Sequence, residues 1–313
     1  MRKRAFFILN PHSGKGQIKN HLLEITDILV KAGYDVTVYP TQSRGDAVRV
    51  VKNRDRSYDL IVCSGGDGTL DEIVTGMMQS GFKTPIGYIP SGSTNDFANS
   101  LRLPSGMKKA AEVVASGKTF ACDVGLFNND VFVYIAAFGI FTEVSYGTPQ
   151  EMKNILGYMA YILEGVKHLQ NIQSCRMKFT YKPAGADSEA LPQEVVIEDD
   201  FIFGMVTNSF SVGGFKGITE NVSGKNIALN DGLFEVTLVK MPRNPLELNS
   251  ILGAFLSEKV DTEYMYCFKT GGLLIESPEA VAWTLDGEFG GNHTRIELKD
   301  KKEAIDIIVR EAN

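Results

Sequence analysis

Short hydrophobic runs that each end in a turn dominate the first hundred residues of the chain. Four of these runs predict buried strands, because they are continuous and too short for a helix; they span residues 5–9, 36–39, 60–63 and 86–89. After the first and third runs, hydrophobic residues recur at helical spacing, through residues 18–29 and 70–78. Repeated strand–turn–helix units predict a parallel sheet with helices on both faces.

Beyond residue 121 the pattern changes to alternating or hydrophobic runs, separated by turn signals such as Asp231-Gly232. These runs predict an antiparallel sandwich or barrel; they span residues 122–127, 131–141, 175–182, 194–207, 234–240, 263–269, 273–276, 281–285, 295–298 and 304–309. We expect residues 131–141 to form one core strand, because the run is too short to cross a bilayer. Helical stretches at 149–169 and 245–256 interrupt the strands.

The turn after the third run, Gly65-Gly66-Asp67-Gly68, carries the first chemical signal. A strand, a glycine-rich turn and a helix in that order direct backbone N–H groups toward one point, which favours a phosphate. Asp67 would repel that phosphate unless a divalent cation lies between them, so the turn indicates a Mg²⁺–phosphate complex. The simpler interpretation is that Asp67-Gly68 is only a turn dipeptide. Thr69 and Glu72 predict a capping box at the start of the helix.

Ligands of parallel α/β sheets bind beyond the carboxyl ends of the strands. In this chain those ends carry small and polar residues; they are Asn10, Thr41, residues 65–69 and residues 91–96. We therefore expect four turns to converge on one edge of the sheet.

The Gly14-Lys15-Gly16 turn resembles a phosphate loop, but it lacks the leading glycine and the trailing hydroxyl of the P-loop motif, which excludes that family.

Composition narrows the class of protein. With 313 residues the chain can hold two domains, and its formal net charge of −6 argues against nucleic acid as the main partner. The four cysteines show no paired spacing, which indicates reduced thiols of a cytoplasmic protein. The four histidines lack the spacing of metal ligands, which argues against a zinc site.

Three longer motifs occur in order: Asn-Pro-His-Ser-Gly-Lys-Gly at residues 10–16, Ser-Gly-Gly-Asp-Gly-Thr-Leu-Asp-Glu at 64–72, and Ile-Pro-Ser-Gly-Ser-Thr-Asn-Asp-Phe-Ala at 89–98. With further motifs at 212–215, 228–233 and 283–288, they resemble the diacylglycerol kinase catalytic family over nearly the whole chain, specifically its soluble bacterial lipid kinases.

The resemblance implies a fold of α/β plus all-β class. Residues 1–122 and 300–313 would form an α/β nucleotide-binding domain with a parallel sheet, similar to those of NAD kinases and phosphofructokinases. Residues 123–299 would form an antiparallel β-sandwich that contributes the lipid site and the catalytic base. The last strand, at 304–309, would return to the first domain.

The residue roles also follow from the resemblance. Glu288 matches the proton acceptor of the family, Asp286 is its companion, and Asp67 is directed toward a catalytic Mg²⁺. A second, structural Mg²⁺ would take the Asp231 carboxylate and the carbonyls of Ala228 and Leu233. ATP would be held by residues of four turns: Asn10, Ser13, Gly14, Lys15, Gly16, Thr41, Gly65, Gly66, Asp67, Gly68, Thr69, Leu70, Asp71, Glu72, Ser93 and Thr94. Either Ser93 or Thr94 would meet ATP, since relatives often have Gly-Thr in that turn.

A carboxylate near the attacking hydroxyl suits phosphoryl transfer, because a neutral lipid hydroxyl is a poor nucleophile. In a strand, Asp286 and Glu288 would share one face. Alternatively, Asp286-Gly287 forms a hairpin turn and Glu288 is exposed. Asp231-Gly232 has a similar alternative, a hairpin turn that binds no metal.

The main hypothesis is an ATP- and Mg²⁺-dependent lipid kinase that converts diacylglycerol to phosphatidate. Sphingoid bases, phosphatidylglycerol and undecaprenol stay open as substrates. An NAD kinase shares the Gly-Gly-Asp-Gly-Thr turn, but the motifs at 10–16 and 89–98 argue against it. A catalytically idle nucleotide- or lipid-binding regulator would not require Asp67, Asp286 and Glu288 together.

A water-insoluble substrate requires transient contact with a membrane, so we expect a cytoplasmic protein that associates with membranes transiently. The stretch at 149–169 has tyrosines and flanking lysines, as an interfacial helix can have, although core packing explains such a stretch more often. The oligomeric state, a homodimer included, stays open.

Overall fold

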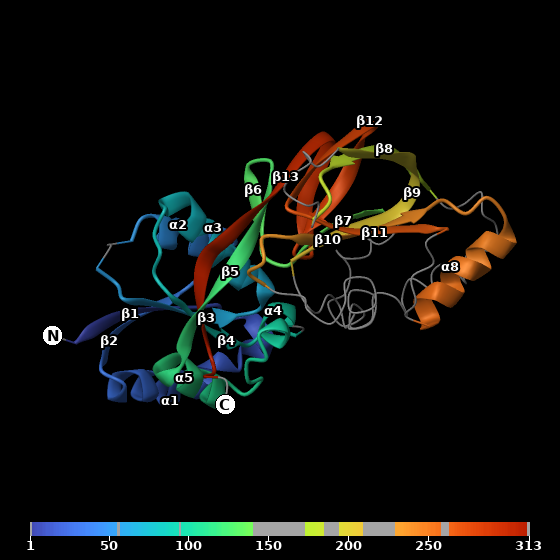
Figure 1. Cartoon of the computed structure of the whole chain (residues 1–313). Helices are drawn as coiled ribbons and strands as arrows, with labels where there is room; N and C mark the ends of the chain where they lie inside the picture. Colours follow the sequence, from blue (N-terminus) through green and yellow to red (C-terminus); the bar gives the residue numbers. More distant parts are fainter. Residues whose placement is uncertain are drawn as a thin grey trace. The chain divides into compact units, whose positions relative to one another are not determined.

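The computed structural model describes residues 2–54, 57–93, 95–139, 173–184, 194–208, 229–257 and 263–311. The chain divides into two compact units, which we describe separately. Unit 1 comprises residues 1–123 and 302–313, and unit 2 comprises residues 124–301 (Figure 1). The divisions lie next to the expected domain boundaries; the functional roles assigned to the two domains stay predictions.

Unit 1 contains a parallel sheet with strand order β2-β1-β3-β4, formed by β1 (Lys3–Leu9), β2 (Tyr34–Pro40), β3 (Leu60–Gly65) and β4 (Ile86–Pro90). The neighbouring strands in this order pair in parallel, as the strand–turn–helix pattern predicts. The end of β13 (Glu288–Val309) extends the sheet, since Ile307 pairs in parallel with Ile86 of β4. A further strand, β5 (Lys118–Phe127), pairs with β13.

Helices cover both faces of this sheet (Figure 1). On one face α1 (Ile18–Lys31) packs against α5 (Met107–Ser116), and on the other α2 (Asp46–Lys52) packs against α3 (Asp67–Ser80). Two short helices follow strand ends: the 3₁₀ helix η1 (Ser13–Gly16) and α4 (Asp96–Ser100). All six residues of β3 are buried, because helices lie on both of its sides.

The capping box expected at Thr69 and Glu72 is wrong. Helix α3 begins at Asp67, its N-cap residue is Gly66, and no side chain caps it. Thr69 therefore lies inside the first turn, and its hydroxyl accepts a hydrogen bond from the Asn10 side chain. The glycine turn lets the helix begin three residues earlier than the capping box predicts.

Unit 2 is built from antiparallel strands: β6 (Asp130–Phe132), β7 (Ile135–Gly139), β8 (Cys175–Tyr181), β9 (Val195–Thr207), β10 (Phe234–Lys240), β11 (Met265–Thr270) and β12 (Gly272–Leu285), together with the first part of β13. The long strands β9 and β12 both pair with β8 at one end and with β7 at the other. Strands β10 and β11 continue the sheet beyond β9. Helix α8 (Pro245–Ser257) follows β10.

The core of unit 2 is rich in aromatic side chains. Trp283, the one tryptophan of the sequence, is fully buried and lies 4.8 Å from Phe138 and 5.4 Å from Phe127, measured between ring centroids.

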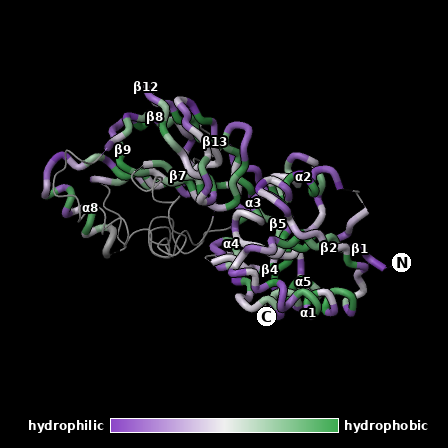
Figure 2. Tube along the Cα trace, turned by 180° about the vertical axis from the view of Figure 1, so that it is seen from behind, coloured by the Kyte–Doolittle hydropathy of each residue, from purple (hydrophilic) through white to green (hydrophobic). Residues whose placement is uncertain are grey.

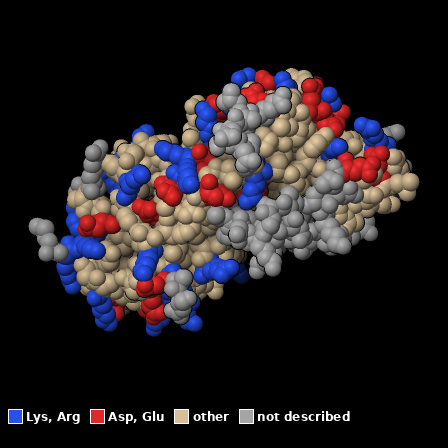
Figure 3. Space-filling view, viewed as in Figure 1, with Lys and Arg blue, Asp and Glu red and all other residues tan. Residues whose placement is uncertain are grey.

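Figure 2 shows hydrophobic positions (green) along the strands and hydrophilic positions (purple) at turns and helix faces. Basic and acidic side chains are interspersed over the face seen in Figure 3. No helix in the described ranges is long and apolar enough to cross a membrane.

Three strand predictions need correction. The run 131–141 does not form one strand: β6 ends at Phe132, β7 begins at Ile135, and residues 140–141 lie outside the described residues. Residues 273–276 and 281–285, expected as separate strands, both belong to β12. Residues 295–298 and 304–309, also expected as separate strands, both belong to β13. The helical stretch expected at 149–169 also lies outside the described residues.

Candidate active site

The turns that follow β1 to β4 are joined at one edge of the sheet of unit 1. The backbone N–H of Asn10 donates to the Ser64 carbonyl at 2.8 Å, and that of Thr41 donates to the Leu9 carbonyl at 2.9 Å. The N–H of Ser91 donates to the Gly65 carbonyl, also at 2.8 Å. The structure therefore brings together the four strand ends that the sequence selects.

Glycines allow three of these turns to approach backbone to backbone. A Cβ atom built at Gly92 would lie 2.5 Å from the Cα atom of Gly66, and one built at Gly14 would overlap the carbonyl oxygen of Ser91. Gly14 also has a φ of 55°, in the left-handed region that favours glycine. No larger side chain fits between these turns, so the backbone itself lines this part of the site.

Replacing Gly92 by alanine should therefore disturb the turns without affecting the core. Because the added methyl would meet backbone rather than a movable side chain, we expect Gly92→Ala to weaken ADP binding roughly tenfold or more, measured by isothermal titration calorimetry. Gly253→Ala in α8 is the matched control, since, apart from its own helix, no described residue has an atom within 4 Å of the added methyl group. Equal affinities of the two variants would contradict the close approach of the turns.

Asn10 connects the first turn to the third. Its side-chain amide donates to the Thr69 hydroxyl at 3.3 Å, and its Oδ1 accepts the N–H of His12 at 2.9 Å. Asn10 and Thr69 therefore hold the turn after β1 against the first turn of α3.

Asp67 lies between the starts of two helices. It is the first residue of α3, and its carboxylate accepts the N–H groups of Asp96 and Phe97, at the start of α4, at 3.1 and 3.4 Å. Burial, and in second place the negative charge of Asp67, raises the pKa of the Tyr88 hydroxyl and of the Cys63 thiol. The negative charge of Asp67 therefore acts, after burial, on two buried groups of β3 and β4.

This position fits a divalent cation. A carboxylate has about four acceptor directions, and carboxylate oxygens are among the ligands that Mg²⁺ takes in proteins. The Gly66 turn beside it has little space beyond its backbone, since a Cβ there would lie 3.3 Å from Gly92 Cα. An anion–cation pair would therefore approach backbone N–H groups directly, as it does in phosphate sites.

A pocket of about 1150 Å³ opens beside the turns that follow β1 and β4. Gly14, Lys15 and Ser93, three of the residues predicted to bind ATP, line it. Its wall also carries cationic or titratable side chains that the sequence did not single out: His12, His21, Lys108, Lys109 and Arg310. Glu24 pairs with His21 and Lys108 and offsets part of this charge, whereas Lys15, Lys109 and Arg310 add positive charge suited to a polyanion.

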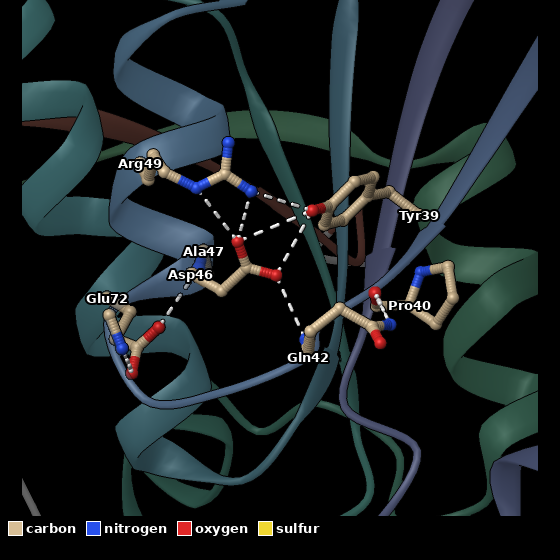
Figure 4. A network of polar contacts seen from close by, with 8 residues as sticks. Tyr39, Pro40, Gln42, Asp46, Ala47, Arg49 and Glu72 are labelled. Carbon is tan, nitrogen blue, oxygen red and sulfur yellow. Dashed lines mark hydrogen bonds and ion pairs between the residues drawn. The ribbon is translucent and has the colours of Figure 1, made fainter.

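The other residues predicted to bind ATP have different environments. Leu70 is 1% exposed and its side chain belongs to the core, so only its backbone can face a ligand. The carboxylate of Glu72 is hydrogen-bonded to the start of α2, where it accepts the N–H groups of Gly45 and Ala47 (Figure 4). Gly68 and Ser93 are exposed, and Thr94 lies outside the described residues.

Asn95 is a site residue that the sequence did not single out. Its side chain accepts the N–H of Gly92 at 2.8 Å and donates to the Gly92 carbonyl at 2.9 Å, while its own φ is 52°. Asparagine is one of the few residues that tolerates this left-handed conformation. The sequence does contain an indication of this role, because Asn95 stands within the motif at residues 89–98.

Asp286 and Glu288, the carboxylates predicted for catalysis, lie at a hairpin of unit 2. Asp286-Gly287 forms the two-residue turn between β12 and β13, with φ values of 50° and 84°. The two carboxylates therefore do not share the face of a strand. Glu288 is exposed, whereas Asp286 is 6% exposed.

The Asp286 carboxylate accepts hydrogen bonds from the backbone around it. It accepts the N–H groups of Val133, Tyr134 and Ile135 at 2.6, 3.0 and 2.9 Å. The hydroxyl of Tyr134 donates to the Asp286 carbonyl at 3.1 Å. Asp286 thus fixes the hairpin that presents Glu288, and it also explains the break between β6 and β7.

Asp231, predicted as a ligand of the structural Mg²⁺, faces an ammonium group. Its Oδ2 lies 3.7 Å from Nζ of Lys269, which also lies 2.8 Å from the Glu235 carboxylate, and its Oδ1 accepts the N–H of Leu233 at 3.0 Å. Ala228 lies outside the described residues. Within the described ranges, no cluster of three or more Asp, Glu, His or Cys is placed to hold a metal ion. The second metal stays a prediction.

Comparison with known proteins gives the family. The model of the diacylglycerol kinase catalytic domain matches residues 4–127. A diacylglycerol kinase from Bacillus subtilis (strain 168) is 32% identical over 291 residues, which cover 92% of this chain and 91% of that protein. The chain belongs to the diacylglycerol kinase family. Another relative, the diacylglycerol kinase of Staphylococcus epidermidis (strain ATCC 12228 / FDA PCI 1200), is 34% identical over 293 residues, covering 93% of this chain and 87% of that protein.

A solved structure from Bacillus anthracis strain Sterne, described as that of a candidate diacylglycerol kinase, has the same fold. Its TM-score is 0.79 at 23% sequence identity, and the likeness covers 99% of this chain and 98% of that one. The family resemblance and the enzyme class predicted from the sequence, a lipid kinase of the diacylglycerol kinase family, are confirmed. The coarse fold prediction, an α/β unit and a β-rich unit, agrees with this likeness.

Proposed function

We propose that this member of the diacylglycerol kinase family is an ATP- and Mg²⁺-dependent kinase that phosphorylates the hydroxyl of diacylglycerol to give phosphatidate. The observation that carries the proposal is the likeness over 92% of the chain to a protein named diacylglycerol kinase. Unit 1 would be the nucleotide-binding domain, similar to those of NAD kinases and phosphofructokinases. Unit 2 would be a β-sandwich that supplies the lipid site.

The turns of unit 1 support the nucleotide part of the proposal. Backbone N–H groups near Gly66 at the start of α3 and the basic pocket beside Lys15 would together hold a triphosphate. Asp67 would hold Mg²⁺, which when bound neutralises charge on the phosphates. Asn10 and Thr69, which join two of these turns, would keep them in place during turnover.

The position of Glu288 supports the part of the proposal that concerns the lipid hydroxyl. Its exposed carboxylate stands directly after a turn that Asp286 fixes, so its backbone is held while its side chain can meet a ligand. We infer that it accepts the proton of the lipid hydroxyl as the γ-phosphoryl group is transferred. Since diacylglycerol does not dissolve in water, the enzyme would contact the membrane transiently.

The proposal predicts a specific product. Incubation with labelled ATP, Mg²⁺, a panel of lipids in detergent and NAD as a further acceptor should label diacylglycerol at least roughly tenfold faster than a sphingoid base, phosphatidylglycerol or undecaprenol, because the pocket must recognise one lipid in the transition state. Thin-layer chromatography and mass spectrometry identify the product, and EDTA should abolish the labelling. Label transferred to NAD instead, or to no acceptor in the panel, would overturn the proposal.

A further inference from the structure

The loop between β2 and α2, residues 41–45, is held at its start by a buried acid. Asp46 is 5% exposed, and its Oδ2 accepts the N–H of Gln42 at 2.9 Å (Figure 4). The Tyr39 hydroxyl lies 3.1 Å from the same oxygen, and the Arg49 guanidinium donates to Oδ1 through Nε at 3.1 Å. The acid thus links the end of β2, the loop and the first turn of α2.

These partners also keep Asp46 ionised. Burial by itself would raise the pKa of the Asp46 carboxyl, but the hydrogen bonds from Gln42, Arg49 and Tyr39, together with the charge of Arg49, lower the pKa below its ordinary value. A charged acceptor makes stronger hydrogen bonds than a neutral one.

The end of the same loop is held by a second acid, on a different helix. Glu72 of α3 accepts the N–H of Gly45 at 2.7 Å through Oε1 and the N–H of Ala47 at 3.1 Å through Oε2 (Figure 4). Both oxygens are therefore directed at the start of α2. Because α3 begins at Asp67, Glu72 connects loop 41–45 to the helix whose first turn forms the phosphate site.

The position of the loop in the sheet indicates what it serves. The glycine turns follow β1, β3 and β4, whereas β2 is the outer strand of the order β2-β1-β3-β4. A nucleotide whose phosphates lie at the glycine turns and whose other end extends toward β2 would meet loop 41–45, including Thr41. Carboxylates bond the loop near both of its ends, so the two acids determine its conformation.

We propose that Asp46 and Glu72 are positioning residues that preform loop 41–45 for the adenosine end of ATP, and that neither carboxylate contacts the nucleotide. The inference rests on the proposed function, and it replaces the role of phosphate ligand that the sequence predicts for Glu72. A loop that is already ordered does not have to lose its conformational freedom on binding, which raises affinity.

The test compares Asp46→Asn and Glu72→Gln with Asp27→Asn, an acid-to-amide change at an exposed ion pair of α1. We expect the Kd for ADP and the KM for ATP to rise roughly tenfold in both loop variants, because each loses a charge-assisted hydrogen bond, while kcat at saturating ATP changes less than about twofold. Inhibition by tripolyphosphate should not change, since that ligand has no adenosine.

Several outcomes would overturn the inference. If Glu72 binds phosphate directly, Glu72→Gln will weaken inhibition by tripolyphosphate as much as it weakens binding of ADP. If the loop needs no positioning, both variants will bind ADP like Asp27→Asn. If the wild-type enzyme binds ADP but phosphorylates no lipid, the proposed function fails, whereas calorimetry with ADP still tests the positioning role.

If either variant unfolds, a milder substitution and a measurement on the wild-type protein still test the inference. Tyr39→Phe removes one hydrogen bond to Asp46 and should raise the Kd for ADP about twofold to threefold. Hydrogen exchange of the Gln42, Gly45 and Ala47 amides in the wild-type protein should be slow without nucleotide, since carboxylates hold all three. Fast exchange that slows only when ADP is added would show that the loop is not preformed.

Discussion

Glu288→Gln should lower kcat for lipid phosphorylation by roughly 10²–10⁴-fold, the usual contribution of a positioned general base. Glutamine has nearly the same size as glutamate, but it cannot accept the proton of the attacking hydroxyl. ADP affinity, measured by calorimetry, should stay within about twofold of the wild-type value, because the groups proposed to bind nucleotide belong to unit 1.

Glu279→Gln, at an exposed glutamate of the neighbouring strand β12, is the control for the loss of one surface charge. It should leave kcat unchanged. A Glu288→Gln variant that keeps full turnover would exclude Glu288 as the proton acceptor, and a loss of ADP binding of the same size would assign it to nucleotide recognition instead.

Asp286→Gly should destabilise unit 2 by roughly 3 kcal/mol or more. The variant leaves the buried N–H groups of Val133, Tyr134 and Ile135 without the carboxylate, and each unsatisfied buried donor costs about 1–3 kcal/mol. Glycine is chosen over alanine because residue 286 has a φ of 50°, where alanine would add backbone strain. Urea unfolding followed by circular dichroism gives the free energy.

Two neighbouring variants make this measurement specific. Asp286→Asn keeps one acceptor oxygen and tolerates the left-handed conformation. The free energy of unfolding should therefore fall by less, about 1–2 kcal/mol. Glu288→Gln, two residues away and exposed, should change the free energy of unfolding by less than about 0.5 kcal/mol. Equal losses for Asp286→Gly and Glu288→Gln would show that the three N–H groups do not depend on the Asp286 carboxylate.

The strands of the sheet in unit 1 were predictable because their signal is local. Each strand is a short hydrophobic run that ends in a turn, and the order of turns along the chain determines which loops reach the ligand edge. The expected strand at 131–141 failed for a non-local reason. The N–H groups of Val133 and Tyr134 bond to Asp286, more than 150 residues later, and a hydrophobicity pattern contains no information about that contact.

The roles of individual acidic residues also depend on non-local contacts that the sequence pattern does not contain. Glu72 has the spacing of a capping box with Thr69, yet its partners are Gly45 and Ala47 at the start of another helix. Asp46 was not singled out at all, since a single aspartate after a glycine is typical of many helix starts. Motif spacing identified the glycine turns of the site, whereas the residues that support those turns became visible only through their tertiary contacts.

The burial of Trp283 gives the protein a built-in optical reporter. Unit 2 contains the one indole of the sequence, which packs against Phe127 and Phe138. Selectively excited tryptophan fluorescence will therefore report the unfolding of unit 2 and not that of unit 1. Comparing this emission with a whole-molecule signal such as ellipticity tells whether the two halves melt together or in succession, with no dye or added label.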